Sequence, residues 1–217
     1  TPLNADVGDH TVIVTATDDG TGTLTVTDTF VLTVTNTNDA PTVTSALSAA
    51  STAEDGSYSL DVSSMCTDVD VGDALAYTMS GAPSTLSIAS GTISGTPLNA
   101  DVGDHTITVT CTDDSSAAAT ASDSYVLTVT NTNDAPTLAT AQADASTAED
   151  ALYTLDVSGN FADVDVGDSL SYTATGMPTT MTMSTAGVLS GTPVNADVAA
   201  HTVVVTATDG TASVTDT

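Results

Sequence analysis

The sequence predicts an all-β protein built from tandem Greek-key β-sandwich modules of about 95 residues. Three observations lead to this prediction. Long motifs recur: TPLNADVGDHT begins at Thr1 and again at Thr96, and the related TPVNADVAAHT begins at Thr192. Apolar and polar residues alternate, as in Tyr125-Val-Leu-Thr-Val-Thr, which is typical of half-buried strands. Turn-forming residues separate these runs, and no segment has the periodicity of a helix.

The composition favours a folded chain over a disordered one. Hydrophobic residues make up 40% of the chain and charged residues only 13%, whereas disordered chains combine low hydrophobicity with high charge. Thr and Val are abundant, and both are β-branched residues that suit a pleated sheet. The long period indicates a whole domain copied in tandem, because solenoid repeats span only about 20–50 residues.

Seven short strands are expected in the copy that is complete in the sequence. They follow the alternating runs between turn signals, and the run nearest residue 93 is the weakest. The expected strands are Thr42–Ala46, Tyr58–Val62, Ala74–Met79, Thr85–Ala89, Thr92–Ser94, His105–Thr112 and Asp123–Thr130. Seven strands in this length suit a sandwich of two sheets.

The NTNDAP segments that begin at Asn36 and Asn131 divide the chain, because a Pro after a polar run favours an extended connection. We expect the C-terminal part of a module at residues 1–40, a complete module at 41–135 and a module lacking its last strand at 136–217. The missing strand has two interpretations: the sequence is an excerpt from a longer array, or an identical subunit in a filament donates a strand. Residues 1–29 duplicate 192–217, which favours the excerpt. The sequence has no recognisable signal peptide or membrane segment, and in an excerpt this absence says nothing about secretion.

The charge balance excludes several classes of partner. The chain has 28 Asp and Glu, three His and no Lys or Arg, for a formal charge of −28. Nucleic acids and anionic membranes are therefore not expected as partners, since both are bound through cationic side chains. Two carboxylates about 4 Å apart repel by roughly 4 kcal/mol at an effective dielectric near 20. Wherever the fold gathers several Asp residues, we therefore expect a bound cation.

Three motifs occur in the same order in successive copies: LNADVGDHTITVTCTDD from Leu98, DVDVGDALAYTMSG from Asp68 and the NTNDAP linker. On these motifs the chain resembles the dystroglycan-type cadherin-like and putative-Ig tandem repeats of large bacterial surface proteins. The resemblance covers essentially the whole chain. It implies Ig/cadherin-like sandwiches, an extracellular location at the cell surface and, often, Ca²⁺ at the junctions between modules. It does not imply one shared activity.

The acidic motifs are candidate calcium ligands, because Ca²⁺ takes six to eight oxygen ligands from carboxylates, amides and backbone carbonyls. The only two Glu residues, Glu54 and Glu149, occupy the same place in two copies, as a ligand that needs extra reach would. Carried over from the cadherin pattern, the junction after the complete module uses Glu54, Asn99, Asp101, Asn131, Asn133, Asp134, Asp163, Asp165 and Asp209. The preceding junction uses Asn4, Asp6, Asn36, Asn38, Asp39, Asp68, Asp70 and Asp113.

The chain departs from the cadherin pattern in ways that bear on the number of ions. Asn replaces the first Asp of two of the motifs, and the linker is one residue shorter. Fewer charges would weaken binding or reduce each cluster to one or two ions. A structural alternative also stays open: Asp and Asn form turns by hydrogen bonding to their own backbone, without any metal.

Two cysteines occur, both in the complete module. Cys66 aligns with Phe161 of the next copy, and Cys111 aligns with Ala207. A large and a small apolar residue, both replaced by Cys, suggest that the two positions touch across the core and form a disulfide, which would suit an oxidising extracellular compartment. Two free core thiols are the alternative.

We expect no enzyme. The recurrent His10, His105 and His201 precede the same strand in each copy and are interpreted as residues at strand edges. The sequence predicts a non-enzymatic structural repeat protein, a calcium-stiffened shaft of a surface adhesin, stalk or filament whose partners are its neighbouring modules. The alternative is a recognition module that binds a carbohydrate or a partner protein. Outward-facing Thr residues are compatible with O-glycosylation or with β propensity alone.

Overall fold

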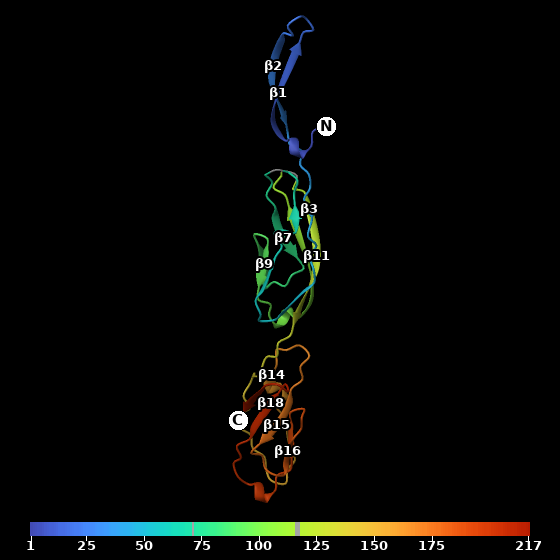
Figure 1. Ribbon diagram of the computed structural model, residues 1–217. Helices are drawn as coiled ribbons and strands as arrows, with labels where there is room; N and C mark the ends of the chain where they lie inside the picture. Colours follow the sequence, from blue (N-terminus) through green and yellow to red (C-terminus); the bar gives the residue numbers. More distant parts are fainter. Residues whose placement is uncertain (71, 116–117) are drawn as a thin grey trace. The chain divides into compact units, whose positions relative to one another are not determined.

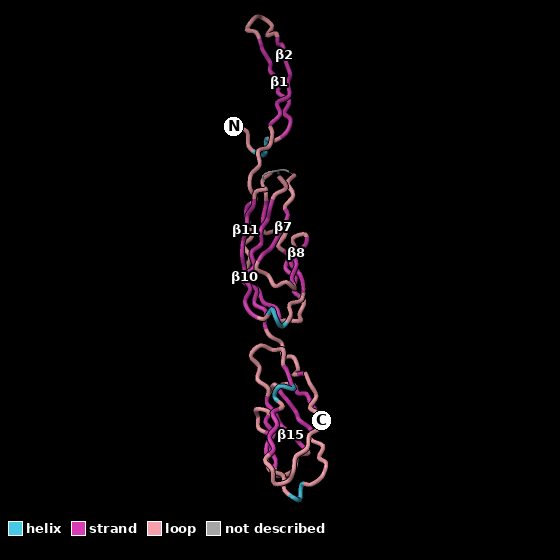
Figure 2. The backbone as a smooth tube through the Cα atoms, turned by 180° about the vertical axis from the view of Figure 1, so that it is seen from behind, coloured by secondary structure: helices cyan, strands magenta, loops and turns pink. Residues whose placement is uncertain are grey.

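The protein is all-β, as the alternation of apolar and polar residues predicts. The structure is a computed structural model that describes residues 1–70, 72–115 and 118–217. Figure 2 shows strands joined by loops, with helix limited to short turns. These turns are the 3₁₀ segments η1 (Asn4–Asp6), η2 (Asn99–Asp101), η3 (Ser158–Asn160) and η4 (Asn195–Asp197).

The chain forms two compact units. The first comprises Thr1–Thr52, Gly56–Pro97 and Gly103–Val129, and the second comprises Ala53–Asp55, Leu98–Val102 and Thr130–Thr217. The second unit thus includes two short segments whose sequence positions lie in the expected module 41–135. Figure 1 labels the strands in chain order.

The first unit contains a hairpin and a sandwich. The hairpin is β1 (Gly8–Thr17) with β2 (Thr25–Val34). The larger sheet has the order β4 (Ala50–Ala53), β11 (Thr120–Thr130), β10 (Gly103–Thr112) and β7 (Ala76–Ser80). The other strands form β5 (Tyr58–Asp61), β9 (Thr92–Gly95) and β8 (Leu86–Ala89), and the pair β3 (Thr42–Val43) with β6 (Cys66–Thr67).

After the linker the second unit has a similar arrangement of strands, but its described residues include no counterpart of β4. One sheet has the order β13 (Tyr153–Asp156), β17 (Val188–Gly191) and β16 (Met181–Met183). The other has the order β15 (Ser171–Thr175), β18 (Val204–Thr208) and β19 (Ser213–Asp216), and β12 (Thr137–Leu138) pairs with β14 (Phe161–Ala162). The core of this unit consists of Val157, Phe161, Tyr172, Val205 and Ala207.

All seven expected strands are present, and two further short strands, β4 and β6, were not expected. The inward positions of the alternating runs form the core of the first sandwich, where Ile93, Ile107, Val109 and Leu127 are fully buried. The expected strand at Thr42–Ala46 is shorter than predicted. Thr44 and Ser45 both donate their backbone N–H to the carbonyl of Met65, which ends the regular ladder after Val43.

Cys66 and Cys111 form a disulfide, with 6.6 Å between their Cα atoms. Cys66 lies in β6 and Cys111 in β10, so the bond joins two different sheets of the first unit. Both residues are buried. In the second unit the same positions hold Phe161 and Ala207, which pack in its core without a covalent bond.

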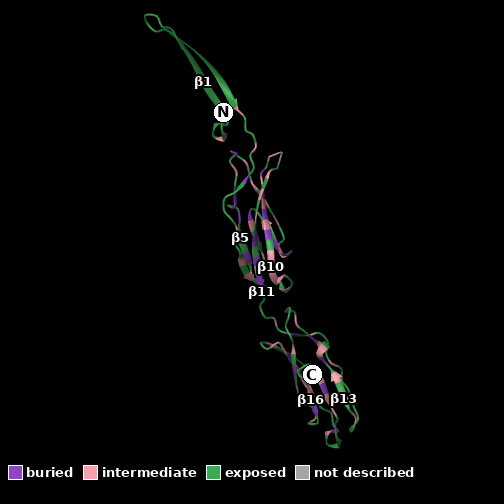
Figure 3. Cartoon of the chain, turned by 90° about the vertical axis from the view of Figure 1, so that its right-hand side faces the viewer, coloured by how far each residue is buried: buried purple, intermediate pink, exposed green. Residues whose placement is uncertain are grey.

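The hairpin β1–β2 has the same sequence pattern as β10–β11 but is exposed on both faces (Figure 3). Phe30 and Leu32 are each 49% exposed, whereas their counterparts Tyr125 and Leu127 are 4% and 0% exposed. The difference has a simple cause: strands from residues 42–95 cover that face of β10–β11, and the sequence has no counterpart of those residues for the hairpin.

An aspartate fastens the start of each sandwich to its last strands. Asp123 accepts a hydrogen bond from the backbone N–H of Leu47 at 2.7 Å, and Asp216 accepts one from Gln142 at 2.6 Å. The equivalent residue of the hairpin, Asp28, is exposed, and among the described residues its one hydrogen bond is from the adjacent Thr29 N–H. The long-range bond therefore forms in both sandwiches but not in the isolated hairpin.

We predict that Asp123→Ala lowers the free energy of unfolding of the first sandwich by about 1–3 kcal/mol, because the Leu47 N–H loses its acceptor. The matched control Asp28→Ala should change stability by no more than about 0.5 kcal/mol, as exposed substitutions usually do. Urea unfolding with hydrogen exchange followed on peptides from each unit would measure both effects. Equal effects from the two variants would contradict the prediction.

We also predict that replacing both cysteines with Ala destabilises the first sandwich by about 4 kcal/mol, the chain-entropy estimate for the closed loop. The second unit has no cysteine and serves as an internal reference in the same exchange experiment. A matched variant, Cys66→Phe with Cys111→Ala, copies the apolar pair of the other unit and should recover part of the loss. If the double Ala variant unfolds at the parent urea concentration, the disulfide does not support the fold.

Candidate metal centres

Two DVDVGD loops, each directly after a short strand, gather aspartates at one end of a sandwich. In the second loop the Asp165 N–H donates to Asp163 Oδ1 at 3.0 Å, and the Asp168 N–H donates to the Asp165 carbonyl at 3.3 Å. Gly167 adopts a positive φ of 102°, which glycine tolerates and which turns the chain back. As a result, one carboxylate oxygen from each of the three aspartates lies within 4.8 Å of the others.

The first loop repeats this geometry. Asp70 N–H donates to Asp68 Oδ1 at 2.9 Å, Asp73 N–H donates to the Asp70 carbonyl at 3.4 Å, and Gly72 has a φ of 104°. The oxygens of Asp68, Asp70 and Asp73 again lie within 4.8 Å of one another. The same six-residue sequence therefore produces the same cluster twice.

Linker residues complete what we call the first acidic cluster. Asp39 N–H donates to Asp70 Oδ2 at 2.7 Å, which fixes the linker to the loop. The Asn4 amide donates to Asp39 at 2.9 Å and to Asp70 at 3.2 Å. The Asn38 amide donates to Asp113 at 2.9 Å. The first acidic cluster is Asn4, Asn38, Asp39, Asp68, Asp70, Asp73 and Asp113.

The second acidic cluster lies within the second unit and follows the same plan. Asp134 N–H donates to Asp165 Oδ2 at 2.9 Å, and the Asn99 amide donates to the Asp134 carboxylate. The Asn133 amide donates to Asp209 Oδ2 at 3.0 Å. This cluster is Glu54, Asn99, Asn131, Asn133, Asp134, Asp163, Asp165, Asp168 and Asp209.

Glu54 is the most deeply buried acid of the second cluster, at 2% exposure. It directly follows β4, and its Oε1 accepts the Thr132 N–H at 2.8 Å. One terminal atom of the Asn131 amide lies 3.0 Å from Glu54 Oε1 and 3.3 Å from Asp165 Oδ1. If that atom is nitrogen, it donates to both carboxylates. If it is oxygen, three oxygens converge, and a bound cation would hold them together.

Several buried oxygens of the clusters have no hydrogen-bond donor within the described residues. They are Glu54 Oε2, Asp68 Oδ2, Asn99 Oδ1 and Asp163 Oδ2. A buried carboxylate oxygen without a donor is costly, because its desolvation is not compensated. The chain offers no Lys or Arg to neutralise it. Hard oxygen donors of this kind, carboxylates mixed with amides, fit Ca²⁺.

The carboxylates of the clusters differ in their titration. Partial burial raises the pKa of Asp73, and the nearby carboxylates, Asp114 first, raise it further. Burial, followed by Asp165, Asp163 and Asp209, raises the pKa of Asp168. The pKa of Asp113 is lowered instead, chiefly by the Asn38 amide and Ser115.

Some residues predicted as ligands lie outside these contacts. Asp6 and Asp101 each accept a backbone N–H within their own loop, from Leu3 at 2.9 Å and from Leu98 at 3.0 Å. Such turn bonds need no metal. Asn36 and Glu149 are exposed. Among the described residues, no paired strand precedes Glu149, whereas β4 precedes Glu54.

Three acids near the clusters were not predicted as ligands: Asp73, Asp168 and Asp114. Asp73 and Asp168 are the third Asp of each DVDVGD motif, so the recurrence of this motif in the sequence could have identified them. Asp114 is next to Asp113 and accepts the Ala74 N–H at 3.3 Å. Its counterpart in the next copy is Gly210, so only the first cluster has this additional carboxylate nearby.

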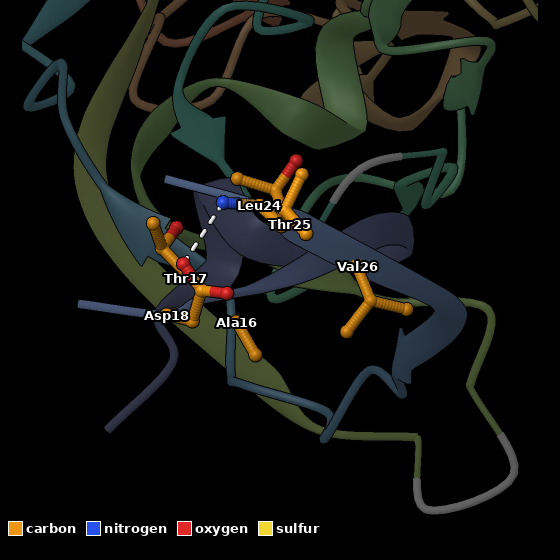
Figure 4. A pocket seen from close by; sticks show the side chains of 6 residues that line it. All are labelled: Ala16, Thr17, Asp18, Leu24, Thr25 and Val26. Atoms are coloured by element: carbon orange, nitrogen blue, oxygen red, sulfur yellow. Dashed lines mark hydrogen bonds between the residues drawn. The ribbon is translucent and has the colours of Figure 1, made fainter. Parts of the chain in front are cut away.

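A separate hollow at the far end of the hairpin lacks the features of a site. Its lining residues are all exposed, and Asp18 is the single acid among them: Ala16, Thr17, Asp18, Leu24, Thr25 and Val26 (Figure 4). Asp18 accepts the Leu24 N–H at 2.9 Å, which closes the turn between β1 and β2. In the part of the chain that the structure describes, no helix has the length and apolar character needed to cross a membrane.

Solved structures with a similar fold are cadherin ectodomains. The chain aligns over its full length with mouse cadherin-23 EC22–24, at 20% identity and a TM-score of 0.61, and spans 75% of that chain. Protocadherin gamma B7 extracellular cadherin domains 1–4 also align, at 19% identity and a TM-score of 0.54. The alignment covers 98% of this chain and 56% of the protocadherin chain. Similarity at these identities shows the fold alone.

An endo-fucoidan hydrolase of glycoside hydrolase family 107 also aligns, at 24% identity. The chain spans only 34% of that protein, and a TM-score of 0.41 is too low to indicate a shared activity. No curated protein matches the sequence.

The family comparison gives a positive match over most of the chain. The Putative Ig domain model matches residues 40–130 and again residues 135–217. Domains of this Ig-like and cadherin-like kind are typically extracellular and non-enzymatic. With two tandem copies of that domain and a cadherin-like sandwich fold, the chain belongs to the Putative Ig domain family.

Proposed function

We propose that this chain is part of a non-enzymatic shaft of a cell-surface adhesin, stalk or filament, in which Ca²⁺ stiffens the connections between successive modules. The observation that carries the proposal is the burial of Glu54, which is 2% exposed. Its Oε2 has no donor among the residues that the structure describes, and the sequence contains no Lys or Arg. A buried charge of this kind calls for a bound cation.

An ion would stiffen the chain because its candidate ligands come from segments before, within and after the linker. In the second cluster, Glu54 and Asn99 precede the linker, Asn131 and Asp134 belong to it, and Asp165 follows it. A bound Ca²⁺ would supply positive charge that these oxygens share, so that segments before and after the linker could not separate without losing ligands. The first cluster repeats the pattern with Asn4, Asp39 and Asp70.

The high negative charge fits the same role. A formal charge of −28 makes copies of the chain repel one another, which favours soluble, separate shafts. The tandem family match supports an array in which the partners of each module are its neighbours. The expected modules at 1–40, 41–135 and 136–217 remain part of this proposal.

We predict that calcium raises the melting temperature of the chain and that Glu54→Gln weakens calcium binding by about tenfold, because one charged ligand is lost. In chelator, Glu54→Gln should be at least as stable as the parent, since a neutral amide costs less to bury than a lone carboxylate. Calorimetric titration with calcium chloride and thermal unfolding with and without chelator measure the two effects.

Glu149→Gln is the matched control, because it removes the same charge from the equivalent but exposed position. It should leave both calcium affinity and the calcium-induced shift unchanged. The proposal fails if calcium leaves the melting temperature of the parent unchanged, or if Glu54→Gln and Glu149→Gln respond identically.

A further inference from the structure

We propose that Asp168 and its counterpart Asp73, the third carboxylates of the two DVDVGD loops, are direct ligands of a divalent cation. This inference rests on the proposed function, since it adds a ligand to the same clusters. The cadherin pattern carried onto this sequence uses only the first two aspartates of each loop, so neither residue was assigned by the resemblance.

The separation of the oxygens suits one ion. Oxygens bound to the same Ca²⁺ at about 2.3–2.6 Å lie at most about 5 Å apart. One oxygen each of Asp163, Asp165 and Asp168 falls within 4.8 Å of the others, and the first loop has the same spacing. A single cation can therefore contact all three carboxylates of a loop.

The hydrogen bonds distinguish a ligand from a turn residue. Asp163 accepts an N–H of its own loop, as turn-forming aspartates do. Among the described residues, no donor reaches the carboxylate of Asp168, which is exposed, or of Asp73, which is half-buried, although one oxygen of each lies within 4.8 Å of two other carboxylates. Neither carboxylate is therefore engaged in a turn-forming hydrogen bond, and both have oxygens that can bind a cation.

An independent observation points to a cation in the same place. Glu54 is only 2% exposed, and its Oε2 has no donor among the described residues. Its Oε1 lies 3.0 Å from the Asn131 amide atom that is also 3.3 Å from Asp165 Oδ1. Asp163 Oδ2 is likewise buried without a donor. Two oxygens without a donor, Glu54 Oε2 and Asp163 Oδ2, therefore belong to the same cluster as Asp168.

The third carboxylate of each loop also replaces negative charge that the clusters lack in comparison with the cadherin pattern. Asn replaces Asp at two positions of the cadherin pattern, which removes negative charge from each site. Asp168 and Asp73 each restore one. Affinity for Ca²⁺ rises with the number of charged ligands, so the extra aspartate compensates for the substitutions.

The test is to count the water molecules on a bound lanthanide in the full chain. Terbium chloride replaces calcium, and luminescence lifetimes in H₂O and D₂O give the number of coordinated waters. We expect Asp73→Asn with Asp168→Asn to add about one water per bound ion, because water fills the vacated position. Each single variant should add about half as much when averaged over both clusters. Calorimetry with calcium chloride should show about a tenfold loss of affinity at the altered cluster.

Asp144→Asn is the matched control, because this exposed residue of the second unit belongs to neither cluster. It should leave the water count and the affinity at parent values. If the parent binds terbium and calcium but Asp168→Asn and Asp73→Asn keep the parent water count, the ligand assignment is wrong and the proposed function stands. If the parent binds neither ion, both are wrong. Circular dichroism of each variant verifies that the fold is retained.

Discussion

The structure depends on one electrostatic constraint: 28 carboxylates must be accommodated without any Lys or Arg. Salt bridges to those residues are impossible, so each carboxylate needs solvent, an N–H or O–H donor, or a metal. Asp123 and Asp216 use backbone N–H groups to fasten the start of each sandwich. The two acidic clusters are different, because several of their buried oxygens have no donor in the part of the chain that the structure describes. The fold thus contains carboxylates that are fully hydrogen-bonded within a module and others that, in the proposed function, bind a cation.

Much of the fold follows from local sequence. Strands β10 and β11 were predicted because their Thr, Val and Ile residues alternate over many positions. Strands β4 and β6 were not predicted, for two different reasons. The segment Ala50–Ala53 has almost no apolar alternation and becomes a strand only because β11 lies beside it, while Cys66–Thr67 is too short to produce a pattern. Pairing between segments distant in sequence decides both.

The acidic positions could be predicted from the repeats, but their individual surroundings could not. Glu54 and Glu149 share the motif STAED, yet one is buried and the other exposed. The difference arises because Glu54 follows a paired strand, and its backbone N–H donates to the carbonyl of Thr130 at 3.0 Å. Asp73 and Asp168 were overlooked because the resemblance transfers only the first two aspartates of the loop. Whether an oxygen lacks a donor depends on how loops meet, which no sequence pattern states.

The disulfide of the first unit has a mechanical consequence. When an array is pulled from its ends, an unfolded domain lengthens by the contour of its polypeptide. The bond between Cys66 and Cys111 takes a sequence separation of 45 residues out of the loaded path. At about 3.3–3.6 Å per extended residue, this shortens the maximal extension by roughly 150 Å. The neighbouring domain, which has no cysteine, would release its whole length. A single covalent bond therefore makes otherwise similar repeats differ in the length that each releases when it unfolds under tension.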